Sequence, residues 1–159
     1  MKVALSINGE TRSADVEPRK TLLDCLRDDF GLTGSHTGCE HGVCGACTIL
    51  LDGYSARSCL MLAVQADGHE ILTVEGIAPD AKTLHPLQQA FLDEQAGQCG
   101  YCLSGIIMSA KALLDRNPRP SRGEIVRALD KHLCRCGAQP RILRAVEKAA
   151  AMMQGGKGA

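Results

Sequence analysis

The 159-residue sequence has no tryptophan, only 3% aromatic residues and no net charge. Its core must therefore be built from aliphatic side chains, chiefly Leu, Ile, Val, Ala and Met. The 18 basic residues equal the 18 acidic ones in number, and we find neither a basic patch for nucleic acid nor an acidic tail. A net charge near zero favours a protein that associates with other proteins.

Long apolar runs are also missing. No window approaches the roughly 18 apolar residues of a membrane span. The apolar stretch over residues 1–7 is stopped by Asn8, Gly9 and Glu10 before it is long enough for a secretory signal. We therefore expect a cytoplasmic protein without direct membrane insertion. The sequence also lacks a G-x-G-x-x-G fingerprint and a P-loop, so we expect no complete active site and no catalytic residue in this chain.

The first half of the chain has the pattern of a small sheet. Val3, Leu5 and Ile7 alternate with polar or small residues, and Asn8-Gly9 predicts a hairpin turn. A helix is predicted from Thr21 to Gly31. Further strands are predicted over 11–16, 48–51, 58–64 and 71–74.

The second half is helical in pattern. The apolar spacing predicts four helices, over 86–95, over 104–117, from Ser121 and from about Pro140. Ser121 and Glu124 have the spacing of a capping box, and proline suits the first turn of a helix. A polar connection near residues 77–84 separates the helical half from the β-rich half.

What the chain has in abundance is cysteine, with nine residues. Disulfides are rare in the cytosol, and an odd number would leave one thiol over. Cysteine-rich cytosolic proteins bind metals more often. The sequence therefore predicts a metal protein in which Cys25, on the predicted first helix, is a buried structural thiol.

The first group of four cysteines has the spacing C-x4-C-x2-C, with the last member 12 residues further on. This is the plant-type spacing for [2Fe–2S] ligands, and thiolates are the soft donors that iron–sulfur clusters require. Three glycines in the loop allow the backbone to wrap closely and to direct N–H groups at sulfur. A zinc site is the alternative, but zinc ligands usually come as two short pairs. The group consists of Cys39, Cys44, Cys47 and Cys59.

The second group of four comes as two close pairs, which are compatible with a cluster or with zinc. The first group favours a second [2Fe–2S] cluster here, and a zinc-bound interaction module remains the alternative. The group consists of Cys99, Cys102, Cys134 and Cys136.

Three segments taken together resemble the iron–sulfur subunit of the xanthine dehydrogenase family of molybdenum hydroxylases. They read GCEHGVCGACTILLDG, QCGYCLSGIIMSAKALL and HLCRCGAQPRI. Within the family, the chain is similar to the small subunits of bacterial N-heterocycle, aldehyde and carbon monoxide dehydrogenases. The resemblance extends from about Leu5 to Ala150.

The resemblance implies an α+β fold, with a β-grasp, plant-type ferredoxin domain over 1–76 and a four-helix bundle with its own [2Fe–2S] site over 85–154. Residues 77–84 are then a linker and residues 155–159 a flexible tail. The implied partners are a large molybdopterin-binding subunit and, as electron acceptor, an FAD-binding medium subunit or a cytochrome. The chain would pass single electrons from the molybdenum centre, first through the helical cluster and then through the ferredoxin cluster. A free-standing ferredoxin is the other redox hypothesis, but free shuttles usually carry a strong charge.

The resemblance also assigns a contact with the molybdopterin to Gln98, Gly100 and Cys136. The chain departs from the family pattern near this surface, where the family often has Asn, an aromatic residue, and Thr or Gln. The departures are His132, Gln139 and Leu103. We expect His132 to be a solvated or capping residue. We expect His41 to be exposed, because four cysteines already complete the first site.

Overall fold

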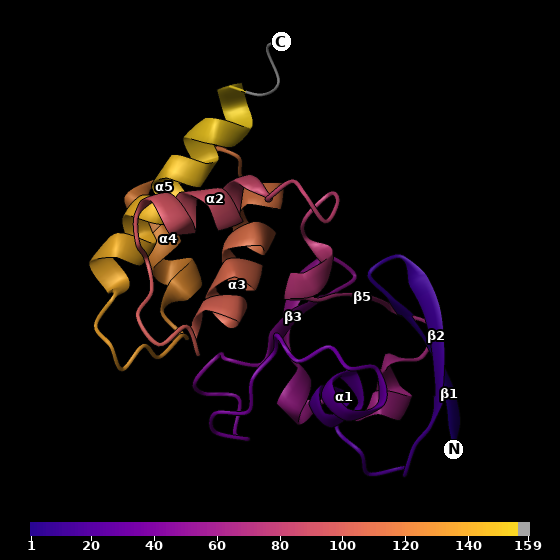
Figure 1. Cartoon of the computed structure of the whole chain (residues 1–159). Coiled ribbons are helices and arrows are strands. Elements are labelled where there is room, and N and C mark those ends of the chain that lie inside the picture. The colour runs from indigo at the N-terminus through magenta and orange to yellow at the C-terminus, as the bar shows by residue number, and fades with distance from the viewer. Residues whose placement is uncertain (156–159) are drawn as a thin grey trace.

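The structure is a computed structural model that describes residues 1–155. The chain has an α+β fold in which a small sheet with one helix precedes four packed helices, as predicted. Figure 1 places the sheet at the lower right and helices α2 to α5 at the upper left, with α3 lying nearest to strand β3. Because α3 packs on β3, the two halves share a buried boundary.

Five strands form one sheet in the order β2-β1-β5-β3-β4. The pair β1 and β5 is parallel, and the other neighbours are antiparallel. The first hairpin turns at Asn8 and Gly9, whose φ angles of 54° and 81° suit a two-residue turn. The strands are β1 (Lys2–Ile7), β2 (Glu10–Asp15), β3 (Thr48–Leu51), β4 (Tyr54–Arg57) and β5 (Glu70–Leu72).

The helix predicted after Thr21 consists of a short α-helical segment, α1 (Leu22–Asp24), that continues as the π-helical segment η1 (Cys25–Asp29). The Thr21 hydroxyl accepts a hydrogen bond from the Asp24 amide at 3.1 Å and caps the first turn. The apolar side of this segment packs on the sheet, in a core that includes Leu5, Ile49 and Cys25.

The strand predicted over 58–64 is wrong. That stretch forms two 3₁₀ turns, η2 (Ser58–Leu60) and η3 (Ala63–Ala66). The Ser58 side chain and amide both donate to the Cys47 carbonyl, at 2.7 and 3.3 Å, and this turns the chain beside β3. Strand β4 was not predicted, because it is an edge strand whose residues are not buried, and Val74 lies in the 3₁₀ turn η4 (Val74–Gly76) rather than in a strand.

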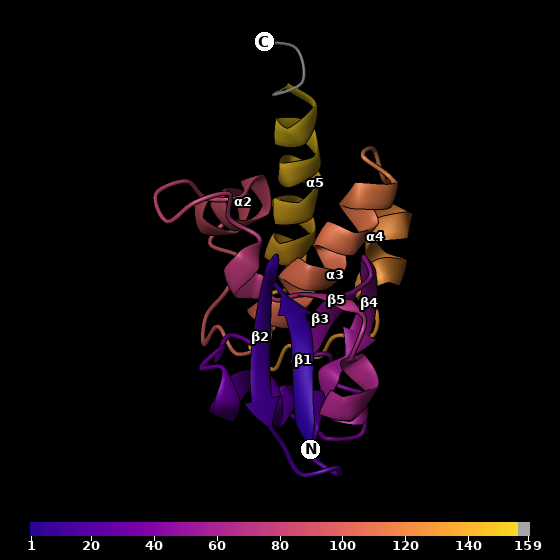
Figure 2. The same ribbon diagram turned by 90° about the vertical axis from the view of Figure 1, so that its right-hand side faces the viewer.

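The four predicted helices are all present. They are α2 (Pro86–Asp93), α3 (Leu103–Arg116), α4 (Arg122–Leu129) and α5 (Gln139–Gly155). The predicted capping box is confirmed, since the Ser121 hydroxyl accepts from the Glu124 amide at 3.3 Å and the Glu124 carboxylate accepts from the Ser121 amide at 2.7 Å. Figure 2 shows α5 standing above the sheet with α3 and α4 beside it. The core of this half also takes in Leu50 from β3.

The division at 76 and 85 stays a prediction, although the strands and the four helices fall on its two sides. Gly155 is the last residue of α5, and the remainder of the predicted tail lies outside the described residues. No helix within residues 1–155 has both the length and the apolar character needed to cross a membrane.

Candidate metal centres

The first group of cysteines lies where a long loop, residues 34–47, meets the sheet. Cys39 and Cys44 are within the loop, Cys47 directly precedes β3, and Cys59 comes from the η2 turn. The structure brings all four together. The Cys47 and Cys59 sulfurs are 3.3 Å apart, and the Cys39 and Cys44 thiols are close enough for each to affect the pKa of the other.

Backbone amides surround the sulfur of Cys39. The N–H groups of His41, Val43 and Cys44 donate to Cys39 Sγ at 3.4, 3.3 and 3.4 Å. These bonds favour the anionic thiolate and lower the pKa of Cys39 to about 6. The loop can curl in this way because Gly42, with φ +73°, adopts a left-handed conformation that side chains disfavour.

Space for sulfur in this loop depends on Gly38. A Cβ at that position would lie 2.6 Å from Cys44 Sγ, which is too close for ordinary contact. The loop therefore has the features of a built site for anionic sulfur, with donors aimed at one thiol and room kept for another.

The second group lies between helices. Cys99 and Cys102 precede α3, and Cys134 and Cys136 occupy the connection between α4 and α5. The Cys99 and Cys136 sulfurs are 3.5 Å apart, and the Cys102 and Cys134 thiols are close enough for each to affect the pKa of the other. Burial, together with the neighbouring thiol of Cys134, raises the pKa of Cys102 to about 12.

The eight thiols therefore meet two by two within each group. In a [2Fe–2S] cluster held by four cysteines, each of the two irons takes two thiolates, so this pairing fits such a cluster at both groups. Burial together with the adjacent Cys47 thiol also raises the pKa of Cys59 to about 11, because two neighbouring thiolates repel each other. Cys47 and Cys59 would both be ligands of a bound cluster, whose cationic iron would offset that repulsion.

The two groups are close to each other. The Leu133 amide, next to Cys134, donates to the Cys44 carbonyl at 3.0 Å. Cys44 also shares a cavity of about 130 Å³ with Cys99, Cys102 and Cys134.

An aromatic contact joins the two loops on another side. The rings of His36 and Tyr101 stack with centroids 4.5 Å apart, and the Tyr101 hydroxyl donates to the Thr37 carbonyl at 2.5 Å. The loop of the first group and the segment of the second group are therefore held together at more than one point.

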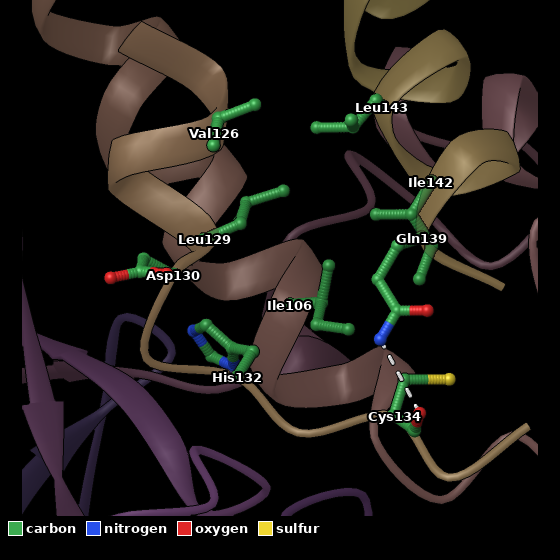
Figure 3. Close-up of a pocket in the computed structure, with 9 residues that line it drawn as sticks. All are labelled: Ile106, Val126, Leu129, Asp130, His132, Cys134, Gln139, Ile142 and Leu143. Carbon is green, nitrogen blue, oxygen red and sulfur yellow. Dashed lines mark hydrogen bonds between the residues drawn. The ribbon is translucent and has the colours of Figure 1, made fainter. Parts of the chain in front are cut away.

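His132 does not lie where we expected it. The residue is only 8% exposed, because its ring packs between Ser109 of α3 and the backbone of Gly45. Its Nε2 lies 2.7 Å from Ser109 Oγ on α3, and burial lowers the pKa of His132 to about 4. Figure 3 shows the ring at the base of a cavity of about 280 Å³ between α4 and α5, with Cys134 nearby.

The remaining predicted residues have simple environments. Gln98 is exposed, Gly100 and Cys136 are half-buried, and His41 is exposed as expected. Cys25 has 0% exposure, and burial raises the pKa of its thiol to about 11, which confirms the prediction of a buried thiol.

Three residues that join the two groups, Gly105, Ser109 and Arg57, were not predicted from the sequence. The Arg57 guanidinium donates to the Lys131 carbonyl at 3.0 Å and to the Gly42 carbonyl at 3.4 Å. Of the three, only Gly105 could have been recognised from the sequence, because an isolated glycine in an apolar helical pattern suggests close packing.

The sheet with its thiol-rich loop, and the helices with their own thiol pairs, define an electron-transfer protein that carries two [2Fe–2S] clusters. Two family models match in series. Residues 5–73 match the 2Fe-2S iron-sulfur cluster binding domain, and residues 73–147 match the [2Fe-2S] binding domain. Iron–sulfur rather than zinc is therefore confirmed for both halves of the chain.

Similar proteins specify the family further. The nicotine 6-hydroxylase small subunit of Paenarthrobacter nicotinovorans is 50% identical over 92% of this chain and 87% of its own length. The nicotinate dehydrogenase small FeS subunit of Eubacterium barkeri is 51% identical over 92% of this chain and 93% of its own. The solved structure of quinoline 2-oxidoreductase from Pseudomonas putida 86 superposes with a TM-score of 0.93 at 45% identity, over 99% of this chain and 97% of that one.

The chain belongs to the iron–sulfur subunits of the molybdenum hydroxylases, the family that the sequence motifs indicated. It is a component of a multi-subunit oxidoreductase, and its part in that assembly is electron transfer.

Proposed function

We propose that one [2Fe–2S] cluster is held by the first group of cysteines and the other by the second group. The observation that carries this assignment is the meeting of the thiols two by two, at 3.3 Å for Cys47 and Cys59 and at 3.5 Å for Cys99 and Cys136. All nine cysteines are free thiols in the structure, so none of these eight is lost to a disulfide. The ligands are Cys39, Cys44, Cys47 and Cys59 for one cluster and Cys99, Cys102, Cys134 and Cys136 for the other.

A bound [2Fe–2S] cluster supplies one-electron chemistry, with a potential set by charge, hydrogen bonds to sulfur and exposure. The protein's own groups adjust these quantities. The three amides at Cys39 Sγ stabilise negative charge there, which favours the reduced, more negative state of the site over the oxidised one. The amide of Leu133 and the carbonyl of Cys44 hold the two loops together.

The direction of transfer is inferred from exposure. We infer that the second group faces the large molybdopterin subunit, since Gln98 and Cys99 are exposed and belong to the segment that the family resemblance places against the pterin. Gly100 and Cys136 are assigned to the same contact. Electrons then pass to the first group and leave to an FAD-binding medium subunit or a cytochrome. We also propose that the assembly works in the cytoplasm, where thiols stay reduced.

The substrate class is proposed from the relatives. The two relatives at 50% and 51% identity are named for nicotine and nicotinate, and the solved structure is that of a quinoline oxidoreductase. All three names denote nitrogen heterocycles. We propose that the assembly containing this chain hydroxylates a nitrogen heteroaromatic compound at its molybdenum centre.

The test is a count of iron and acid-labile sulfide on anaerobically purified protein, with its spectrum and its co-purifying subunits. We expect about four irons and four sulfides per chain, as two [2Fe–2S] clusters require. Cys59→Ser and Cys136→Ser should each lose about half of the iron, from different clusters. Cys25→Ser is the matched control, because that thiol is outside both groups, and it should keep the full content.

Three results would contradict the proposal. Zinc at both groups would leave only an interaction module. Full iron without any co-purifying large subunit would favour a free-standing ferredoxin. Loss of iron in Cys25→Ser together with retention in Cys136→Ser would refute the ligand assignment. The substrate proposal fails separately, if the intact assembly oxidises aldehydes but none of a panel of pyridine, purine and quinoline compounds.

A further inference from the structure

One buried side chain contacts the segments of both cysteine groups. His132 lies two residues before Cys134, and its Nε2 is 2.7 Å from Ser109 Oγ on α3. The other side of its ring faces Gly45, the residue that follows Cys44. Both His132 and Ser109 are buried, with 8% and 6% exposure, so this contact is closed to solvent.

The packing around Gly45 leaves no room for a side chain at this position. A Cβ on Gly45 would lie 2.3 Å from His132 Nδ1 and 2.7 Å from the Lys131 carbonyl oxygen. Gly45 also has a φ of +79°, a conformation that favours glycine. The ring therefore rests directly on the backbone of the first loop, and the loop cannot approach further.

The Nδ1 atom of His132 has no hydrogen-bond partner among the described residues, although it is buried. An unpartnered buried polar atom is costly, and each case in a native structure requires an explanation. An aliphatic side chain would fill the same space without this cost. What the imidazole adds is a rigid, planar body that is anchored at one nitrogen and pressed against the loop on its other side.

We propose that His132 is a positioning residue that holds the Cys44–Cys47 loop against α3 and thereby fixes the separation between the two cysteine groups. The proposal rests on the proposed function, in that both groups hold clusters. Its geometric basis is independent of iron, since the contacts join Ser109, His132 and Gly45. The Cys44–Leu133 hydrogen bond joins the residue before Gly45 to the residue after His132, so we expect it to depend on the same contact.

Loss of the ring should shift the loop without unfolding the protein. Arg57 still ties Lys131 to Gly42, and Tyr101 still bonds to Thr37. These contacts join the loops at Gly42 and Thr37, so the loops stay together in a variant that lacks the imidazole. The backbone at Gly45, against which the ring packs, can then move into the space that the ring occupied, and this changes the separation between the groups.

The experiment compares His132→Ala and Ser109→Ala with the unaltered protein, each purified with its co-purifying subunits. Two reduced [2Fe–2S] clusters interact magnetically, and the dipolar part of this interaction falls with the cube of their separation. We expect the resulting splitting of the low-temperature electron paramagnetic resonance signals to change in both variants, with the full content of iron retained. We also expect faster amide hydrogen exchange in the peptide that contains Leu133.

Two control variants separate positioning from general destabilisation. Ile125→Val loosens the helical core at a fully buried residue but does not touch the loop, and His69→Ala removes an exposed imidazole. Both should leave the splitting unchanged. If His132→Ala does not accumulate iron, Ser109→Ala decides the question, because it removes the anchor and keeps the ring.

The proposal is overturned if iron-replete His132→Ala or Ser109→Ala shows the splitting and the exchange of the unaltered protein. It is also overturned if Ile125→Val changes the splitting as much, because loss of stability would then explain the effect. If the unaltered protein holds fewer than two clusters, the proposed function is contradicted instead. Failure of the His132 proposal and failure of the proposed function are therefore distinguishable.

Discussion

A tight contact between the two halves of the molecule is predicted to make Gly105→Ala strongly destabilising. A Cβ on Gly105, in the first turn of α3, would lie 2.0 Å from the Gly45 carbonyl oxygen and 3.2 Å from Ala46 Cα. Both are backbone atoms, so no side-chain rotation relieves the overlap. Ordinary contact begins at 3.4 Å, so the helix and the loop must separate by about 1.4 Å, from 2.0 to 3.4 Å.

Two effects of opposite sign compete in this variant. Alanine is a better helix former than glycine by up to about 1 kcal/mol. Overpacking of a closed contact typically costs about 1–3 kcal/mol, and occasionally more. Because the atoms in contact are backbone atoms, we expect the upper part of that range and a net loss of about 2 kcal/mol. For a chain of this size, that lowers the midpoint of thermal unfolding by roughly 4–8 °C.

Gly123→Ala is the matched control. Gly123 is also in the first turn of a helix, α4, but its added Cβ would meet only Arg127 Nη1, at 3.5 Å. The higher helix propensity of alanine is then not offset by a steric clash. The midpoint of thermal unfolding should therefore rise by up to roughly 4 °C. The assay is thermal unfolding of iron-replete protein at one scan rate, followed by circular dichroism. Equal shifts of the two variants in the same direction would refute the reasoning.

Three further predictions concern single groups. Ser121→Ala should lower the free energy of unfolding by about 1 kcal/mol, because it removes the side chain that caps α4. An unchanged midpoint of chemical denaturation in iron-replete protein would contradict this. Since the pKa of Cys25 is raised from 9.0 to about 11, the native thiol stays protonated while the unfolded one ionises, so stability should fall between pH 9 and 11. Cys25→Ala should flatten that fall, and an equally steep decline of both proteins would argue against it. After iron removal, alkylation should be fast at the exposed Cys99 and at Cys39, whose pKa is lowered to about 6, and slow at the buried Cys25 until denaturant is added. Mass spectrometry of the labelled peptides decides between this order and uniform labelling.

Local pattern predicted much of this protein. The β3 strand over 48–51, the helix start at Thr21 and the capping box of Ser121 depend on residues near one another in the chain, and the structure confirms each of them. The prediction of a strand over 58–64 was wrong. The apolar residues of this stretch give no sign of the turn in which the Ser58 hydroxyl donates to the Cys47 carbonyl. That turn brings Cys59 to the other cysteines and depends on a partner 11 residues away.

The sequence by itself determined the class of site. Eight cysteines at these spacings, with glycines among them, predict iron–sulfur ligands because thiolate chemistry and loop length are local properties. Only the tertiary structure decided how the two groups face each other. The packing of α3 and of the buried His132 ring on the first loop, at Gly45, joins residues about 60 or more positions apart in the chain, and a long-range contact of this kind leaves no pattern in the local sequence.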